Sequence, residues 1–209
     1  MTVSVYVITK SSSVCTTTLH SLMLIHSFCM NNNMQLSINF HTDRSQIQKN
    51  IKASDRFVFI DYGCSVGGET IRKMLSEFPE GAKALVLPTV MEGVDWALFK
   101  KKTLDKSTEP INQRGLRFNL TVSSKEFSPG VHEYLDHVQD ARVYVLDSKA
   151  LIKKLREDDT KITEDTVILA KLKKLKLKIG VLVQDEVVCH YSYECPGNIL
   201  ESMGVHAGP

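Results

Sequence analysis

Several common functional signatures are missing from this sequence. The first expected strand is followed by no GxGxxG fingerprint, and the chain contains no Walker lysine loop and no GxSxG nucleophile elbow. These absences argue against a dinucleotide-dependent oxidoreductase, a P-loop enzyme and an α/β-type serine hydrolase. No run of residues approaches the roughly 18 consecutive apolar side chains that a membrane-spanning helix requires.

An excess of charge of one sign is missing too. The chain has 26 Lys and Arg against 24 Asp and Glu, so its formal net charge of +2 selects neither a nucleic acid nor an anionic membrane. The five cysteines are scattered and odd in number, which suits a reducing compartment better than a disulfide framework. The amino terminus lacks the basic n-region of a signal peptide. We therefore expect a cytoplasmic protein without a membrane span.

What the sequence does contain is an alternation of apolar runs and amphipathic segments. It predicts an α/β fold, with a mostly parallel sheet flanked by helices and a mixed, loop-rich C-terminal part. No change of composition marks an internal boundary, so we expect a single domain over residues 1–209, alone or within a longer protein. Strands are expected at 3–9, 35–40, 57–60, 83–87, 116–122, 142–146, 178–183 and 186–191, and helices at 17–30, 44–51, 67–78, 131–138, 149–156, from 163 onward, and after Asp95.

The clearest candidate site lies in residues 56–68, with the sequence RFVFIDYGCSVGG. A compact apolar strand ends abruptly at Asp61, and an amphipathic helix follows a short loop. Ligands of open α/β sheets bind at the carboxyl ends of the strands. A carboxylate at such a tip is well placed to hold a metal ion or a sugar hydroxyl. The alternative is that Asp61 only caps the following loop.

Three further features carry weaker signals. Trp96, the only tryptophan, lies next to a turn and could stack on a sugar or base, or pack in the core. His190 lies near Cys189 and Cys195 in a spacing that matches no common zinc site, although a strand-end His and a strand-end Asp can share a hard cation. No aromatic residues interleave with the lysines of 171–176, so we interpret them as a solvated helix face and expect no DNA or RNA partner.

The order of these features resembles the glycosyltransferases of the GT-A fold, particularly small viral and phage-type members. The resemblance covers most of residues 1–160. It is carried by Ser21-Leu22, by Phe59-Ile60-Asp61-Tyr62-Gly63 in place of the family's DXD motif, by Pro88 with Gly93-Val94-Asp95-Trp96, and by residues 143–149. It implies a Rossmann-like GT-A-type sheet, a nucleotide-sugar donor, a glycan or protein acceptor, and a divalent cation, Mn²⁺ or Mg²⁺.

The resemblance also implies roles for individual residues. The donor would be bound by Thr9, Lys10, Ser11, Asp61 and Gly63, and a metal ion by Asp61 and His190. Trp96 would lie on the acceptor side, and the general base would be Asp95 or Glu92.

The chain departs from the family motif where its second acid would stand, because that position is Gly63. Three alternatives remain open. Asp61 could hold the cation with His190 or another acid, or lysine and arginine could stabilise the diphosphate without a metal. The third alternative is a catalytically degenerate GT-A-like binding or assembly module.

Overall fold

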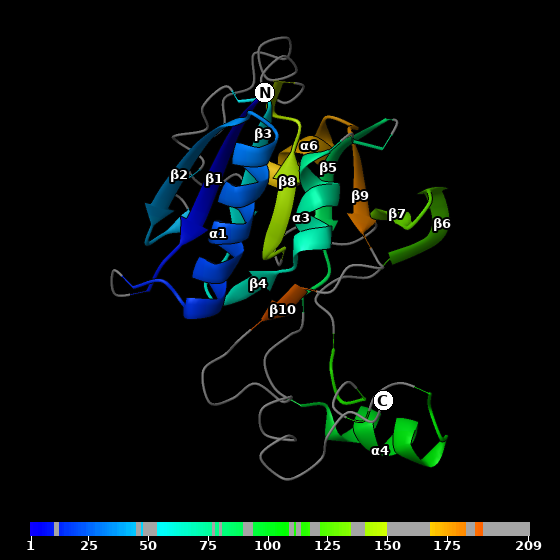
Figure 1. Cartoon of the computed structure of the whole chain (residues 1–209). Coiled ribbons are helices and arrows are strands. Elements are labelled where there is room, and N and C mark those ends of the chain that lie inside the picture. Colours follow the sequence, from blue (N-terminus) through cyan, green and yellow to red (C-terminus); the bar gives the residue numbers. More distant parts are fainter. Residues whose placement is uncertain are drawn as a thin grey trace.

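The computed structural model describes most of the amino-terminal two thirds of the chain and part of the remainder. The described residues are 1–10, 13–44, 47, 54–76, 78–79, 81–89, 94–108, 111, 114–117, 122–134, 141–149, 168–182 and 187–189. Figure 1 shows a central sheet with helices packed on it, and α4 set apart from the sheet. In chain order the elements are β1 (Thr2–Ile8), α1 (Thr16–Asn31), β2 (Gln35–His41), β3 (Arg56–Ile60), β4 (Cys64–Val66), α3 (Gly68–Leu75), β5 (Ala82–Leu87), α4 (Trp96–Leu104), β6 (Val122–Ser128), β7 (Val131–Tyr134), β8 (Val143–Leu146), α6 (Ile168–Lys174), β9 (Lys178–Leu182) and β10 (Val187–Cys189).

The main sheet has eight strands in the order β2-β1-β3-β8-β5-β9-β7-β6. The strands β2, β1, β3, β5, β9 and β6 run in one direction, whereas β8 and β7 run in the opposite one. A separate two-stranded sheet pairs β4 with β10. The expected α/β class, with a mostly parallel sheet flanked by helices, is confirmed.

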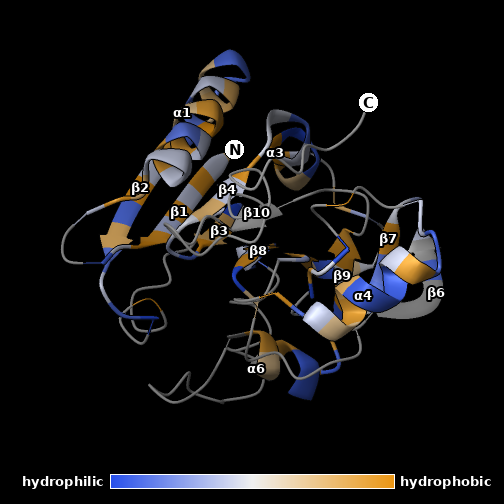
Figure 2. Ribbon diagram, turned by 90° about the horizontal axis from the view of Figure 1, so that it is seen from below, coloured by the Kyte–Doolittle hydropathy of each residue, from blue (hydrophilic) through white to orange (hydrophobic). Residues whose placement is uncertain are grey.

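Both faces of the sheet are buried, which explains why its central strands are continuous apolar runs. In β3, Val58 and Ile60 face one core and Phe57 and Phe59 face the other, as the twofold side-chain period of a strand requires. Figure 2 shows α1 and α3 on one side of the sheet and α6 on the opposite side. Because β2, β1 and β3 are parallel, their carboxyl ends lie side by side at the same end of the sheet.

Helix α1 also holds the small strand β4 in place through two buried hydroxyl groups. Thr18 Oγ1 donates to the carbonyl of Cys64 at 2.9 Å, and the Val66 N–H donates to Ser21 Oγ at 2.8 Å. These contacts satisfy polar backbone groups that would be costly to bury alone. The polar positions 18 and 21 of an otherwise apolar face thus attach α1 to the segment directly after Asp61.

One expected helix is wrong and one is shorter than expected. Residues 131–138 have apolar side chains at helical spacing, but their first part forms β7, because the turn at Pro129-Gly130 (Gly130 φ 72°) pairs it with β6. The helix expected over 67–78 ends at Leu75. The helices expected at 44–51 and 149–156 lie largely outside the described residues. In the described part of the chain, no helix is long and apolar enough to cross a membrane.

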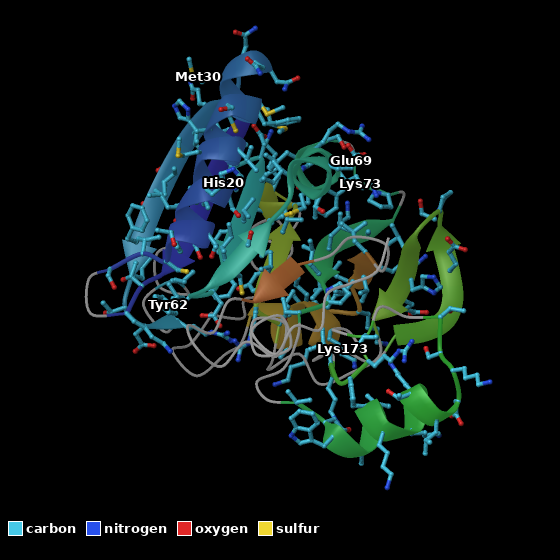
Figure 3. All side chains as sticks on the ribbon, turned by 60° about the horizontal axis from the view of Figure 1, so that its bottom comes forward. His20, Met30, Tyr62, Glu69, Lys73 and Lys173 are labelled. Carbon is cyan, nitrogen blue, oxygen red and sulfur yellow. The ribbon has the colours of Figure 1, made fainter. Side chains whose placement is uncertain are left out.

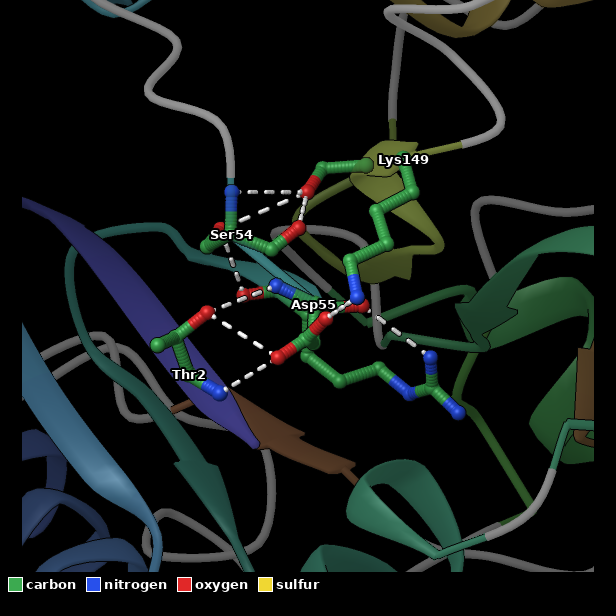
Figure 4. A network of polar contacts seen from close by, with 6 residues as sticks. Thr2, Ser54, Asp55 and Lys149 are labelled. Carbon is green, nitrogen blue, oxygen red and sulfur yellow. Dashed lines mark hydrogen bonds and ion pairs between the residues drawn. The ribbon is translucent and has the colours of Figure 1, made fainter.

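The amino ends of β1 and β3 are joined by a polar network around Asp55 (Figure 4). Its Oδ2 accepts from the backbone N–H of Thr2 at 2.7 Å and from Thr2 Oγ1 at 3.1 Å, and its Oδ1 pairs with Lys149 Nζ. Next to it, the buried Ser148 Oγ donates to the carbonyl of Ser54. The network links three segments that are distant in sequence, at the end of the sheet opposite to Asp61.

We predict that Asp55 makes the stability of the protein depend on pH. The hydrogen bond and charge of Lys149 and the hydrogen bonds of Thr2 lower the pKa of Asp55 from 3.8 to about 2. Because the folded-state pKa is the lower one, this stabilisation is complete above about pH 4 and is lost as the pH falls toward 2. Asp55→Asn should reduce the free energy of unfolding by about 1 kcal/mol at pH 7 and flatten this acid limb, as measured by urea denaturation. The exposed Asp105→Asn is the control, and an equal effect of the two substitutions would contradict the prediction.

Candidate functional site

The candidate site begins with the turn that follows β3. The Asp61 N–H donates to the carbonyl of Arg142 at 2.8 Å, which keeps it aligned with β8. The Cys64 N–H then donates to the carbonyl of Asp61 at 3.2 Å, closing a four-residue turn whose third residue, Gly63, has a φ of 75°. This geometry is that of a type II turn, which favours glycine at its third position. Gly63 therefore has a structural reason to replace the second acid of a DXD motif.

Both oxygens of the Asp61 carboxylate have partners. Arg44 Nη2 donates to Oδ2 at 2.5 Å, and the backbone N–H of Tyr62 donates to Oδ1 at 2.9 Å. The Arg44 guanidinium lies over the ring of Phe59, with its Cζ 5.3 Å from the ring centroid. Only 16% of the Asp61 side chain is exposed, so the arginine shields this carboxylate from water.

The segment after β1 adds a second cation, which lies over the side chain of Tyr62, the residue after Asp61. Lys10 Nζ lies 4.9 Å from the ring centroid of Tyr62, a side chain that Figure 3 shows at the end of the strands. The backbone of Lys10 pairs with that of Ser13, whose N–H donates to the Lys10 carbonyl at 2.9 Å. Thr9 is buried and donates its backbone N–H to the carbonyl of His41 at 2.8 Å, so it joins β1 to the end of β2. Ser11 lies outside the described residues.

Below the carboxylate lies a stack of aromatic rings. Tyr6, Phe57, Tyr144 and Phe59 follow one another with centroid distances of 4.7, 6.2 and 4.8 Å. Burial raises the pKa of Tyr144 well above its usual range, although the nearby Arg44 charge acts in the opposite direction. Tyr144 therefore stays neutral at physiological pH. At the Phe59 end of the stack, Arg44 lies over the ring and pairs with Asp61.

The residues expected on the acceptor side have structural partners of their own. Asp95 caps α4, because its Oδ1 accepts from the N–H of Leu98 at 3.0 Å, and its Oδ2 accepts from Arg117 Nε at 2.5 Å. These contacts, that to Leu98 first, lower the pKa of Asp95 and make it a weak proton acceptor. Trp96 packs edge-on against Phe99 and is 57% exposed, so part of its surface is open to solvent. Glu92 and Gly93 lie outside the described residues.

The described residues do not fit a divalent cation at Asp61. Within these residues, no group of three His, Cys, Asp or Glu side chains could hold a metal ion. Arg44 also occupies the carboxylate oxygen that a cation would need. The backbone of β10 brings Cys189 opposite Cys64 in the small sheet, but His190, the second expected ligand, lies outside the described residues.

Two residues of the site, Arg44 and Tyr62, were not anticipated as functional from the sequence. Arg44 was expected only as the start of a short helix. The sequence does hold a signal for it, since Arg44 follows the end of β2 by three residues. The carboxyl ends of neighbouring parallel strands meet at one edge, so a cation after β2 can reach an acid after β3.

Comparison with known proteins gives a likeness of fold at low identity. No protein-family model matches the chain, and no curated protein matches it significantly. Among solved structures, A197 from STIV is 14% identical over 92% of this chain and 87% of that one, with a TM-score of 0.48. The 4-diphosphocytidyl-2C-methyl-D-erythritol synthase from Anaerococcus prevotii is 10% identical over 96% and 98%, with a TM-score of 0.45.

A glycosyltransferase involved in the glycosylation of the major capsid of PBCV-1 is 8% identical, over 97% of this chain and 98% of that one, with a TM-score of 0.37. The similar structures thus include nucleotidyl- and glycosyltransferases. At these identities and TM-scores, the likeness defines neither the activity nor the substrates of this chain.

The conformation of Gly63 gives a direct prediction about the turn. An L-residue in the left-handed region costs roughly 1 kcal/mol, so Gly63→Ala should lower the free energy of unfolding by about that amount. The matched control is Gly68→Ala, because Gly68 lies in the first turn of α3 and an added Cβ would meet nothing within 4 Å. Urea denaturation of both variants measures the difference. Equal stabilities would show that the turn does not require glycine.

Proposed function

We propose that this chain is a glycosyltransferase that takes a sugar from a nucleotide-sugar donor and passes it to a glycan or protein acceptor. The supporting observation is a pair of cationic side chains at the carboxyl ends of neighbouring strands: Arg44, after β2, pairs with Asp61, and Lys10, after β1, lies over the ring of Tyr62. Ligands of open α/β sheets bind at this edge. Arginine and lysine side chains bind phosphate oxygens through charge-assisted hydrogen bonds, so this pair suits a diphosphate.

In this proposal the donor diphosphate is bound by side chains and backbone groups. Arg44 presents a planar guanidinium that can bind phosphate oxygens in pairs, and Lys10 contributes a point charge. Helix α1 begins shortly after the Lys10 loop, and its first N–H groups carry partial positive charge. No acidic side chain in its first turn neutralises this charge. Charge that develops on the departing diphosphate is thereby stabilised without a divalent cation.

Asp61 has the role of orienting the site. Its ion pair holds Arg44 over Phe59 before the donor arrives, and its remaining lone pairs can accept a hydrogen bond from a ribose hydroxyl. The lowered pKa of Asp95 makes it a weak base, so we assign the general base of an inverting transfer to Glu92. Trp96, exposed at the start of α4, provides an apolar surface on which an acceptor sugar can stack.

The second candidate function is a GT-A-like binding or assembly module without catalysis. It is favoured by the contacts of Asp61, because Arg44 donates to one of its carboxylate oxygens and the Tyr62 N–H donates to the other. A module of this kind would bind no nucleotide sugar at the Arg44 site. Nucleotide binding therefore distinguishes the two functions.

A thermal-shift panel of UDP-, GDP- and CMP-linked sugars, each with Mn²⁺ or with EDTA, tests the proposed donor site. A ligand at one hundred times its dissociation constant adds about 2.7 kcal/mol of stability. We expect one nucleotide class to stabilise the protein equally with Mn²⁺ and with EDTA, and Arg44→Ala to abolish this shift. Arg72→Ala, which removes an exposed arginine paired with Glu69 on α3, should leave it unchanged.

Three other results would revise the proposal. A shift that requires Mn²⁺ would restore a metal site built with residues outside the described ones. A shift that survives Arg44→Ala would place the diphosphate elsewhere. No shift with any nucleotide would favour the binding module.

Removing the orienting acid should separate binding from turnover. We expect Asp61→Ala to reduce transfer, measured as release of the nucleoside diphosphate, by about 100-fold or more, because Arg44 loses the partner that positions it. The fold should survive, since the Arg44 side chain that loses its partner is 42% exposed and can be solvated. Unchanged turnover in a folded variant would remove Asp61 from the site.

A further inference from the structure

A long part of the amino-terminal sequence carries no formal charge. Between Lys10 and Asp43 there is no Asp, Glu, Lys or Arg, although such residues make up 24% of the whole chain. This segment contains α1 and β2. The surface that these two elements present to solvent is therefore neutral, apart from whatever charge its histidines carry.

The same region contains an open edge of the sheet. Among the described strands, β2 pairs only with β1, and it ends the sheet on that side (Figure 1). Exposed edge strands are normally protected by charged residues, proline or bulges. Residues 35–41 contain no charged residue and no proline, and their register with β1 is continuous. Nothing in β2 itself discourages another strand from pairing with it.

Exposed apolar side chains gather beside this edge. Eight large hydrophobic side chains are exposed in the described part of the chain, and five of them, each between 44% and 64% exposed, belong to this side: Met1, Leu19, Met23, Met30 and Phe40. The other three are Trp96, Leu104 and Ile111. A concentration of this kind is typical of an interaction surface.

Helix and strand geometry place these side chains together. Leu19, Met23 and Met30 follow the helical repeat and form one row of α1, next to the buried row of Leu22 and Cys29. Figure 3 shows Met30 on the side of α1 toward β2. Phe40 is opposite Val7 in the register, and Val7 belongs to the core under α1, so Phe40 lies on the same face.

Strand β2 joins the amino end of the chain to this surface. The backbone N–H of Gln35 donates to the carbonyl of Met1 at 3.0 Å, so Met1 lies at the beginning of the edge. We call the open edge of β2 and these five side chains the β2 edge surface.

We propose that the β2 edge surface binds a second copy of this chain, with the two β2 strands pairing across a twofold axis. Twofold symmetry makes such a pair antiparallel and joins the two sheets into one. The axis would lie near Ile38, the middle residue of β2.

The same axis brings the two copies of α1 together. At rises of about 3.3 Å per strand residue and about 1.5 Å per helix residue, the level of Ile38 corresponds to the part of α1 near Met23. The Met23 side chains of the two copies would therefore meet close to the axis.

The size and charge of the surface suit this occupant. Five half-exposed apolar side chains offer on the order of 500 Å² per copy, before the strand edge itself is counted, against about 800 Å² per partner in an interface of standard size. A neutral surface also meets its own copy without electrostatic repulsion, whereas a charged partner would gain nothing from it.

The test uses the whole chain in sedimentation velocity over a range of concentrations. We expect a dimer that dissociates on dilution, and Met23→Glu to raise its dissociation constant about tenfold or more, because two carboxylates would meet near the axis. Leu104→Glu is the matched control: it also introduces an acid at an exposed apolar position, 71% exposed, but on α4. Far-UV circular dichroism confirms that both variants are folded.

A second measurement on the unmodified protein is independent of any variant. Amide hydrogen exchange of residues 35–41 should slow about tenfold or more at dimer-forming concentration, because outward N–H groups of β2 become hydrogen-bonded. A chain that stays monomeric at about 100 μM overturns the proposal. So does a dimer whose β2 amides exchange at the monomer rate, or one that Leu104→Glu dissociates and Met23→Glu does not.

Discussion

The ion pair between Arg44 and Asp61 sets the character of the candidate site. Asp61 ends a strand whose preceding residues are fully buried, so its charge needs a partner near the protein interior. Arg44 supplies that partner from the end of β2, and Phe59 supports the guanidinium from below. Because the partner of Asp61 is an arginine and not a metal ion, the cationic groups described at this end of the sheet are the side chains of Arg44 and Lys10. Gly63, where the related motif has an acid, is explained by the turn that brings Asp61 to this place.

The two acids that flank β3 perform different physical tasks. Asp55 comes before the strand. It accepts hydrogen bonds from Thr2 and forms an ion pair with Lys149, so it connects the start of β3 to the start of β1 and to the segment after β8. Asp61 comes after the strand and has a single charged partner, which itself reaches solvent. A scaffold fixed at the amino ends of the strands leaves the carboxyl ends available for chemistry, which is the usual division in open α/β sheets.

Apolar runs and helical repeats in the sequence predicted the strands and helices that are determined by residues close together in the chain. The apolar runs of β1, β3 and β5, the helical repeat of α1 and the helix after Asp95 are all present.

The predictions failed where a distant partner decides the outcome. Residues 131–138 have apolar side chains at helical spacing, but residues 131–134 form a strand, because β6 and β9 lie on either side of them. Arg44 was overlooked because its significance depends on the register of β2, β1 and β3. Glu92, Ser11 and His190 lie outside the described residues, so their expected roles stay predictions.

The position of β8 has a consequence for how the chain is made. Residues 143–146 lie between β3 and β5, which are separated from each other by only about one helix in the sequence. During synthesis both older strands emerge from the ribosome with an unpaired edge, and these edges stay open until some sixty further residues have been made. The centre of the sheet is therefore completed by one of its later strands. Until residue 146 has been made, these two facing edges can pair with a wrong strand.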